Sequence, residues 1–156
     1  MPVLRASDLY HTGVVVADLD ASLASMAALG GYRWMDPFAV DAPVWTPDGA
    51  TVLPLRFAYS LDPPYLELVQ SVPGTVWEGA PGNAVHHVGC WVDDLAAAST
   101  GLTAEGRPME VCGGADPSAP LAFAYHRGTD GIRIELVDRR LLPDFPAFLR
   151  EHTSSP

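Results

Sequence analysis

The sequence of 156 residues contains no lysine, and this absence excludes several kinds of chemistry. Without a lysine there is no Schiff-base residue for a pyridoxal-dependent enzyme or a lysine-dependent aldolase. A Gly-rich phosphate-binding loop of the common type is excluded as well, because it needs a lysine for the terminal phosphates. The nine basic residues are all arginines, and the 19 acidic residues bring the net charge to −10. This balance argues against nucleic acids and anionic membrane surfaces as partners.

Cysteine and long apolar runs are also scarce. The two cysteines, Cys90 and Cys112, are too few for a disulfide framework and too far apart for a metal-binding knuckle, so we expect both to be buried. No apolar run approaches the roughly 18 residues of a membrane-spanning helix, and the first residues lack the pattern of a signal peptide. The composition, 48% hydrophobic and 18% charged, is typical of a globular protein. We therefore expect one domain over residues 1–156, located in the cytoplasm.

The chain contains an internal repeat, which is seen by comparing residues 9–19 with residues 85–95. Each segment is an apolar run with a histidine, a glycine two residues later and an Asp-Leu pair that begins seven residues after the histidine. Asp18 or Asp20 can cap a helix in the first copy, as Asp94 can in the second, and glycines end both helices. Three short strands are expected after each helix, over residues 32–35, 51–59 and 65–70, and over residues 108–112, 121–126 and 132–137.

These elements predict an α+β fold of two tandem βαβββ modules that form a curved mixed sheet. The parts are repeat 1 (residues 8–70), a linker (71–83), repeat 2 (84–138) and a C-terminal helix (142–152). Long proline-containing loops are expected at residues 37–50 and 113–120. Thr129-Asp130-Gly131 indicates a hairpin between the last two strands.

Each repeat also places a glutamate within an apolar strand. Taken singly, such a glutamate favours a strand with one solvated face, and a lone histidine in an apolar strand favours a core residue. Both residue types recur at equivalent positions, so a pseudo-twofold axis would bring His11, Glu67, His87 and Glu135 to one point inside the sheet. Two imidazoles and two carboxylates there suit a central divalent metal, and would otherwise be costly buried groups. A purely structural role for the four residues is the alternative.

With these features, residues 8–138 resemble the vicinal oxygen chelate superfamily, which includes glyoxalases, bleomycin-resistance proteins and extradiol dioxygenases. The pattern is most similar to glyoxalase I and methylmalonyl-CoA epimerase. The resemblance implies a homodimer and a metal held by His11, Glu67, His87 and Glu135. Such a donor set suits zinc, nickel, cobalt, manganese or iron.

The resemblance also implies a reaction. The expected enzyme is a metal-dependent isomerase, epimerase or lyase of the glyoxalase type, which removes a proton next to a chelated carbonyl or hydroxyl of a small organic substrate. Glu67 or Glu135 would be the catalytic base. Methylmalonyl-CoA epimerases carry a glutamate on the third strand that acts as a base, whereas residues 51–59 contain no acidic residue. The identity of the substrate therefore stays open.

Strand alternation predicts which further side chains line the pocket. Trp91 shares a face with His87, while Tyr65 and Arg133 share the faces of the two glutamates. We interpret these three as substrate-binding residues, with Arg133 as a fixed cation for a carboxylate or enolate. An arginine that reaches solvent at the hairpin mouth is the alternative. His126, at the end of its strand, is a fourth candidate, for substrate binding or proton transfer.

Two other functions stay open. A non-catalytic protein that sequesters a small molecule or antibiotic would use an aromatic crevice, but members of that kind typically lose the metal ligands. A metal-dependent dioxygenase would need two histidines and one carboxylate, with open positions for oxygen. The second carboxylate counts against it.

Overall fold

The computed structural model describes residues 2–79, 82 and 85–154. The chain divides into two compact units. The first consists of Met1–Tyr10, Asp41–Leu53 and His87–Pro143, and the second of His11–Val40, Pro54–His86 and Asp144–Pro156. The first unit thus contains most of repeat 2, and the second most of repeat 1.

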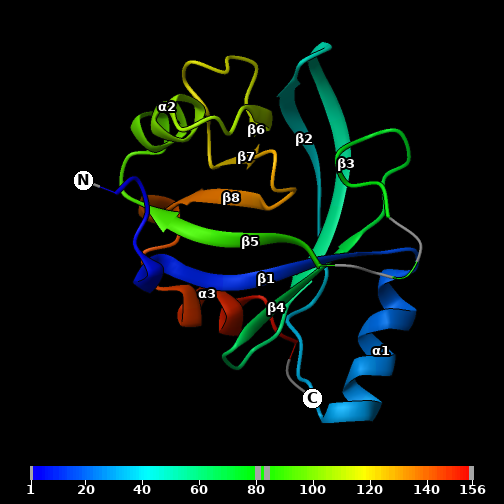
Figure 1. The fold of residues 1–156 in the computed structure, drawn as a ribbon. Coiled ribbons are helices and arrows are strands. Elements are labelled where there is room, and N and C mark those ends of the chain that lie inside the picture. The colour runs from blue at the N-terminus through cyan, green and yellow to red at the C-terminus, as the bar shows by residue number, and fades with distance from the viewer. Residues whose placement is uncertain (1, 80–81, 83–84, 155–156) are drawn as a thin grey trace. The chain divides into compact units, whose positions relative to one another are not determined.

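The second unit is built on the strands of repeat 1 (Figure 1). Its elements are β1 (Leu9–Val16), α1 (Leu19–Gly30), the end of β3 (Gly49–Tyr59), β4 (Tyr65–Gln70) and α3 (Phe145–Glu151). Strand β1 pairs in parallel with β4, and β4 pairs antiparallel with β3. Helix α1 packs against β4, where Leu19 joins Val16 and Leu68 in a small apolar core.

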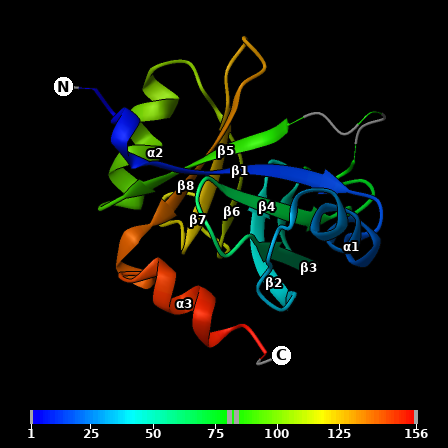
Figure 2. The same ribbon diagram turned by 90° about the horizontal axis from the view of Figure 1, so that it is seen from below.

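The first unit holds the strands of repeat 2 together with most of strand β2. Its elements are η1 (Ala6–Asp8), β2 (Phe38–Thr46), β5 (Val85–Val92), α2 (Leu95–Ala104), β6 (Met109–Gly113), β7 (Phe123–Arg127), β8 (Arg133–Asp138) and η2 (Arg139–Leu141). The strands pair in the order β2-β6-β7-β8-β5, parallel between β8 and β5 and antiparallel elsewhere. Helix α2 packs on β7 and β8, with Leu95, Leu102 and Leu136 in the core (Figure 2).

Each repeat folds as the predicted βαβββ module. The first runs β1-α1-β2-β3-β4 and the second β5-α2-β6-β7-β8. In both modules the first strand pairs in parallel with the last, which gives an α+β fold with mixed strand directions. The prediction of fold class is therefore confirmed.

Aspartates begin both module helices, as their spacing in the repeat predicts. The side chain of Asp18 accepts a hydrogen bond from the backbone N–H of Ala21, and that of Asp94 accepts one from Ala97. Each carboxylate satisfies a backbone donor that the first turn of the helix leaves free. Gly31, in the left-handed region at φ 66°, ends α1.

One strand of repeat 1 lies elsewhere than expected. Residues 32–35 form only an isolated bridge between Trp34 and Ser60, and the predicted loop over residues 37–50 contains β2. Ala42 and Val44 are buried, whereas Asp41 and Pro43 are exposed, so alternating burial keeps this segment in the sheet in spite of its prolines. Pro43 lacks an N–H, but its carbonyl oxygen accepts a hydrogen bond from Gly114.

The chain also contains a hairpin and a C-terminal helix. The hairpin at Thr129-Asp130-Gly131 joins β7 to β8, and α3 lies within the predicted helix over residues 142–152. Residues 80, 81, 83 and 84, around the end of the predicted linker, lie outside the described residues. None of the helices in the described ranges is long and apolar enough to cross a membrane.

Candidate functional site

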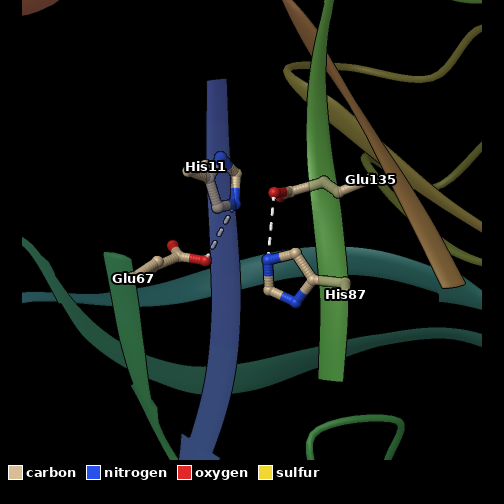
Figure 3. Close-up of side chains that lie close together, drawn as sticks. All are labelled: His11, Glu67, His87 and Glu135. Atoms are coloured by element: carbon tan, nitrogen blue, oxygen red, sulfur yellow. Dashed lines mark ion pairs between the residues drawn. The ribbon is translucent and has the colours of Figure 1, made fainter. Parts of the chain in front are cut away.

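His11 and Glu67 form a buried pair in the second unit. His11 lies on β1 and Glu67 on the neighbouring strand β4, and Nε2 of His11 is 3.4 Å from Oε2 of Glu67 (Figure 3). The imidazole is fully buried and the glutamate side chain is 6% exposed. A carboxylate at this depth needs a positive charge or hydrogen-bond donors beside it.

His87 and Glu135 form the equivalent pair in the first unit. His87 lies on β5 and Glu135 on β8, and the distance between Nε2 of His87 and Oε2 of Glu135 is again 3.4 Å. The imidazole is fully buried here too, and the glutamate side chain is 9% exposed. The two repeats therefore place the same two groups at the same depth and spacing.

A glycine in each repeat explains how the local sequence builds these pairs. Gly13 lies opposite Glu67 in the parallel ladder, and Gly89 lies opposite Glu135. Opposite residues point to the same face of a sheet, so the glycine leaves space for the glutamate side chain. The histidine two residues earlier lies on that face as well. The parallel pairing of the first and last strands of each module thus brings the imidazole and the carboxylate together.

The geometry and the chemistry of each pair fit metal binding. A spacing of 3.4 Å is longer than a direct charge-assisted hydrogen bond of about 2.7–2.9 Å. Two ligand atoms that are each about 2.1 Å from one ion, at a tetrahedral angle, would be about 3.4 Å apart. Imidazole nitrogens and carboxylate oxygens both bind first-row divalent metals. Each pair is therefore suited to supply two ligands to an ion.

Each unit also adds a tyrosine that the repeat pattern above did not single out. Tyr59 on β3 lies opposite Glu67, and Tyr125 on β7 lies opposite Glu135. The Tyr59 ring meets the His11 ring edge-on with centroids 5.2 Å apart, and the Tyr125 and His87 centroids are 5.0 Å apart. The tripeptide Phe-Ala-Tyr, at residues 57–59 and 123–125, is the signal in the sequence that marks both tyrosines.

Residues 10–125 match the family model of the Glyoxalase/Bleomycin resistance protein/Dioxygenase superfamily. The chain belongs to this superfamily. The match covers most of both repeats and confirms the predicted resemblance. A comparison with curated proteins found no match.

The fold of this superfamily member is similar to that of solved methylmalonyl-CoA epimerases. One, in complex with methylmalonyl-CoA and NH4+, has a TM-score of 0.59 and 18% identity over 84% of this chain and 93% of that chain. The epimerase from Mycobacterium tuberculosis has a TM-score of 0.58 and 21% identity, over 88% and 91% of the two chains. A variant epimerase from Streptomyces coelicolor, in complex with 2-nitronate-propionyl-CoA, has a TM-score of 0.60 and 18% identity, over 88% and 95%. At such identities the similarity shows the fold.

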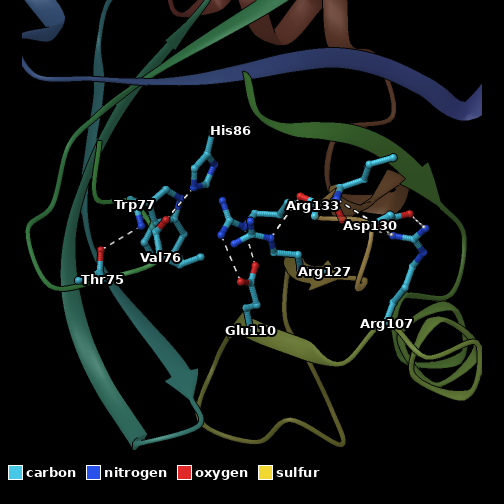
Figure 4. A network of polar contacts seen from close by, with 11 residues as sticks. Thr75, Val76, Trp77, His86, Arg107, Glu110, Arg127, Asp130 and Arg133 are labelled. Atoms are coloured by element: carbon cyan, nitrogen blue, oxygen red, sulfur yellow. Dashed lines mark hydrogen bonds and ion pairs between the residues drawn. The ribbon is translucent and has the colours of Figure 1, made fainter. Parts of the chain in front are cut away.

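Arg133 and Tyr65, two predicted substrate-binding residues of this superfamily member, have partners within their own units. Nε and Nη2 of Arg133 donate to the two carboxylate oxygens of Glu110 on β6 (Figure 4). The guanidinium is therefore already compensated by a carboxylate, in a side chain that is 13% exposed. The Tyr65 ring packs edge-on against Phe145 of α3, with centroids 5.0 Å apart. Substrate binding by either residue stays a prediction.

Trp91 stacks on Tyr10 in the first unit, with ring centroids 3.8 Å apart and planes 12° from parallel. It also lines a groove of about 340 Å³ beside the start of α2, together with Val3, Asp93 and Arg139. Its predicted role in substrate binding stays a prediction too.

His126 lies on the face of β7 opposite to that of Tyr125. Its Nδ1 donates to the carbonyl oxygen of Arg107 at 2.9 Å, which leaves Nε2 to accept from the hydroxyl of Ser99 on α2 at 2.8 Å. Burial lowers the pKa of this imidazole. Strand β7 thus directs His126 toward α2, and its predicted roles in substrate binding and proton transfer stay predictions.

The two cysteines are free and buried, as predicted. Burial raises the pKa of the Cys90 thiol to about 11, with the charges of Asp8 and Glu135 acting in the same direction. Burial also raises the pKa of the Cys112 thiol. Both side chains therefore act as small apolar residues, and a thiolate nucleophile is not favoured at either position.

Proposed function

We propose that this chain is a metal-dependent enzyme of the epimerase or isomerase type, which removes a proton next to a carbonyl or hydroxyl group of a small organic substrate. The observation that most supports this proposal is the buried histidine–glutamate pair, which recurs in both repeats with the same 3.4 Å distance between Nε2 and Oε2. A single pair could be a structural contact. Two equal pairs in a superfamily member favour a shared chemical purpose.

In this proposal the two pairs hold one divalent cation. One ligand atom from each of His11, Glu67, His87 and Glu135 would face the ion. Zinc, nickel, cobalt, manganese and iron all accept two nitrogen and two oxygen ligands. When bound, the cation supplies Lewis-acid polarisation of the substrate oxygens, which makes the neighbouring C–H more acidic.

We assign the proton transfer to Glu67 or Glu135. Both carboxylates are buried at the proposed cation site, where either can accept a proton from a substrate carbon atom held there. The fully buried imidazoles of His11 and His87 lie 3.4 Å from these carboxylates. No residue of β3 is acidic, so a carboxylate base cannot come from this strand.

The solved structures support the reaction type and leave the substrate open. Two of them are named as epimerases with an acyl-CoA compound bound, which favours acid–base chemistry at a carbon atom on this fold. The absence of lysine leaves only arginines to meet the phosphates of such a compound. We therefore propose 2-oxo acids, 2-hydroxy acids and acyl thioesters as the classes to test.

Solvent-deuterium exchange followed by NMR tests this proposal. The protein is mixed with one compound of each class in D2O, with and without added divalent ions, and the expected result is deuterium at the carbon next to the chelating oxygens. Glu67→Gln or Glu135→Gln should slow the exchange by at least about 100-fold, because general base catalysis contributes about that much. Glu105→Gln, which changes the same charge just beyond the end of α2, is the matched control and should exchange at the wild-type rate.

Two results would contradict the proposal. Exchange that is equally fast in the metal-free protein would remove the role of the cation. If protein shown to contain a bound metal exchanged no proton in any class of compound, the proposed proton abstraction from those substrates would be contradicted.

A further inference from the structure

The tripeptide Phe-Ala-Tyr occurs in both repeats and occupies equivalent strands. Residues 57–59 end β3, and residues 123–125 begin β7. The central residues Ala58 and Ala124 are fully buried, and each tyrosine lies opposite the glutamate of its own repeat. Opposite residues share a face, so the tyrosine and the glutamate point to the same side of the sheet.

Each tyrosine ring contacts a phenylalanine ring and a histidine ring. In the second unit the ring centroid of Tyr59 lies 5.8 Å from that of Phe57 and 5.2 Å from that of His11. The planes of the Tyr59 and His11 rings are at 85° to each other. In the first unit the ring centroid of Tyr125 lies 5.8 Å from that of Phe123 and 5.0 Å from that of His87. The planes of the Tyr125 and His87 rings are at 50° to each other. Both tyrosines are at least nine-tenths buried.

We infer that Tyr59 and Tyr125 are positioning residues, which set the orientation of His11 and His87; this inference rests on the proposed function in assigning those imidazoles to metal binding. A buried imidazole turns about its side-chain bonds unless a neighbour blocks the turn. The tyrosine ring blocks this turn, so that the imidazole keeps the orientation in which its Nε2 faces the glutamate oxygen at 3.4 Å. Groups that orient a metal ligand in this way set how well the site binds.

The repeat separates this role from ordinary core packing. A core aromatic residue needs only to fill volume, and its ring need not meet any particular polar group. Here the same ring meets the same imidazole, opposite the same carboxylate, in both units. In the second unit the ring of Phe145 on α3 also meets the Tyr59 ring edge-on, with centroids 5.1 Å apart, so the C-terminal helix contacts this tyrosine as well.

Cobalt binding tests the inference without any need for a substrate. Tyr59→Leu and Tyr125→Leu remove the flat ring, whereas Tyr59→Phe and Tyr125→Phe keep it and lose only the hydroxyl. The two Leu variants should bind Co²⁺ roughly 10- to 100-fold more weakly, with an altered visible absorption spectrum, in the range seen when a group that orients a ligand is removed. The two Phe variants should keep the Co²⁺ affinity and the absorption spectrum of the wild type.

Phe57→Leu and Phe123→Leu are the matched controls. Each removes a ring of the same tripeptide that contacts the tyrosine, and both should lower stability while keeping the Co²⁺ affinity. If a Leu variant fails to fold, Met at the same position fills more of the volume without a flat ring. Wild-type affinity in the folded Leu or Met variants would overturn the inference. So would Phe variants as weak as the Leu variants, since the hydroxyl would then be the group that matters.

Failure of the proposed function gives a different result. A wild-type protein that binds neither Co²⁺ nor Zn²⁺ contradicts the proposed metal site. The positioning role is then decided in the metal-free protein by ¹³C relaxation of the two imidazoles, which should become more mobile in the Leu variants and stay rigid in the Phe variants. Unchanged mobility in the Leu variants would overturn it.

Discussion

Three buried histidines of this chain have different partners, and the partner decides what each imidazole is suited to do. His11 and His87 each direct Nε2 toward a glutamate oxygen. His126 has a serine hydroxyl at one ring nitrogen and a backbone carbonyl at the other. Burial alone thus does not identify a ligand, because a neutral imidazole with both nitrogens satisfied is stable in the core.

The stability of the protein should depend on pH through His126. Burial lowers the pKa of this group in the folded state below its usual value of about 6.5. The unfolded chain therefore binds the proton first, so the contribution is fully present above about pH 6.5 and is lost as the pH falls toward the lowered pKa. Each unit of lowering corresponds to about 1.4 kcal/mol. Urea unfolding between pH 7.5 and 5 measures it, and the advantage of the wild type over His126→Asn should shrink with acid.

Ser99→Ala provides the control for this experiment. The variant loses the hydroxyl next to Nε2 but keeps the imidazole buried, and burial is the largest cause of the lowered pKa. Its pH dependence should therefore follow that of the wild type. A constant difference between wild type and His126→Asn at all pH values would contradict the prediction.

At the scale of elements, the end of β6 shows how a backbone contact decides where a strand stops. The carbonyl of Gly113 accepts a hydrogen bond from the N–H of Leu121, which closes the loop between β6 and β7. On β2, Val44 is the residue opposite Gly113. A side chain at Gly113 would overlap the backbone carbonyl of Leu121, so the close approach requires glycine.

Gly113→Ala should therefore destabilise the protein by about 1–3 kcal/mol or more, because the backbone of the loop has to move away from β6. Gly30→Ala is the matched control. A Cβ at Gly30, the last residue of α1, would meet only the flexible ring of Tyr32 at 3.1 Å, and alanine suits a helix. That variant should lie within about 1 kcal/mol of the wild type. Chemical unfolding of both variants checks the contrast, and equal losses would contradict it.

At the scale of the whole molecule, the proposed cation links binding to folding. A metal that binds only the folded protein raises its stability, by about 2.7 kcal/mol when the free ion is at 100 times its dissociation constant. Addition of Zn²⁺ to the metal-free protein should therefore raise the unfolding temperature, and a chelator should reverse the change. Differential scanning calorimetry measures both steps.

Neighbouring histidines give this measurement a matched pair of variants. His87→Ala removes a proposed ligand and should abolish the response to Zn²⁺. His86→Asn changes the adjacent residue, whose Nε2 contacts the carbonyl oxygen of Val76, and should keep the response. An equal response in both variants would contradict the assignment of His87.

The sequence by itself determined the architecture of two βαβββ modules. Helix caps, the His-x-Gly pattern and glutamates within apolar strands are local signals, since each depends on residues a few positions apart. Their recurrence in both repeats was enough to predict both histidine–glutamate pairs. It also predicted the two helices and most of the strands.

Only the tertiary structure decided which residues surround these pairs. Cross-strand register placed Tyr59 and Tyr125 opposite the glutamates and turned His126 away toward α2. It also assigned Glu110 to Arg133 and drew a proline-containing segment into β2. Each of these outcomes depends on a neighbour from another strand or helix. Successive side chains of a strand point to opposite faces of the sheet, so a shift of the strand register by one residue would move each side chain to the other face. Local patterns do not contain that information.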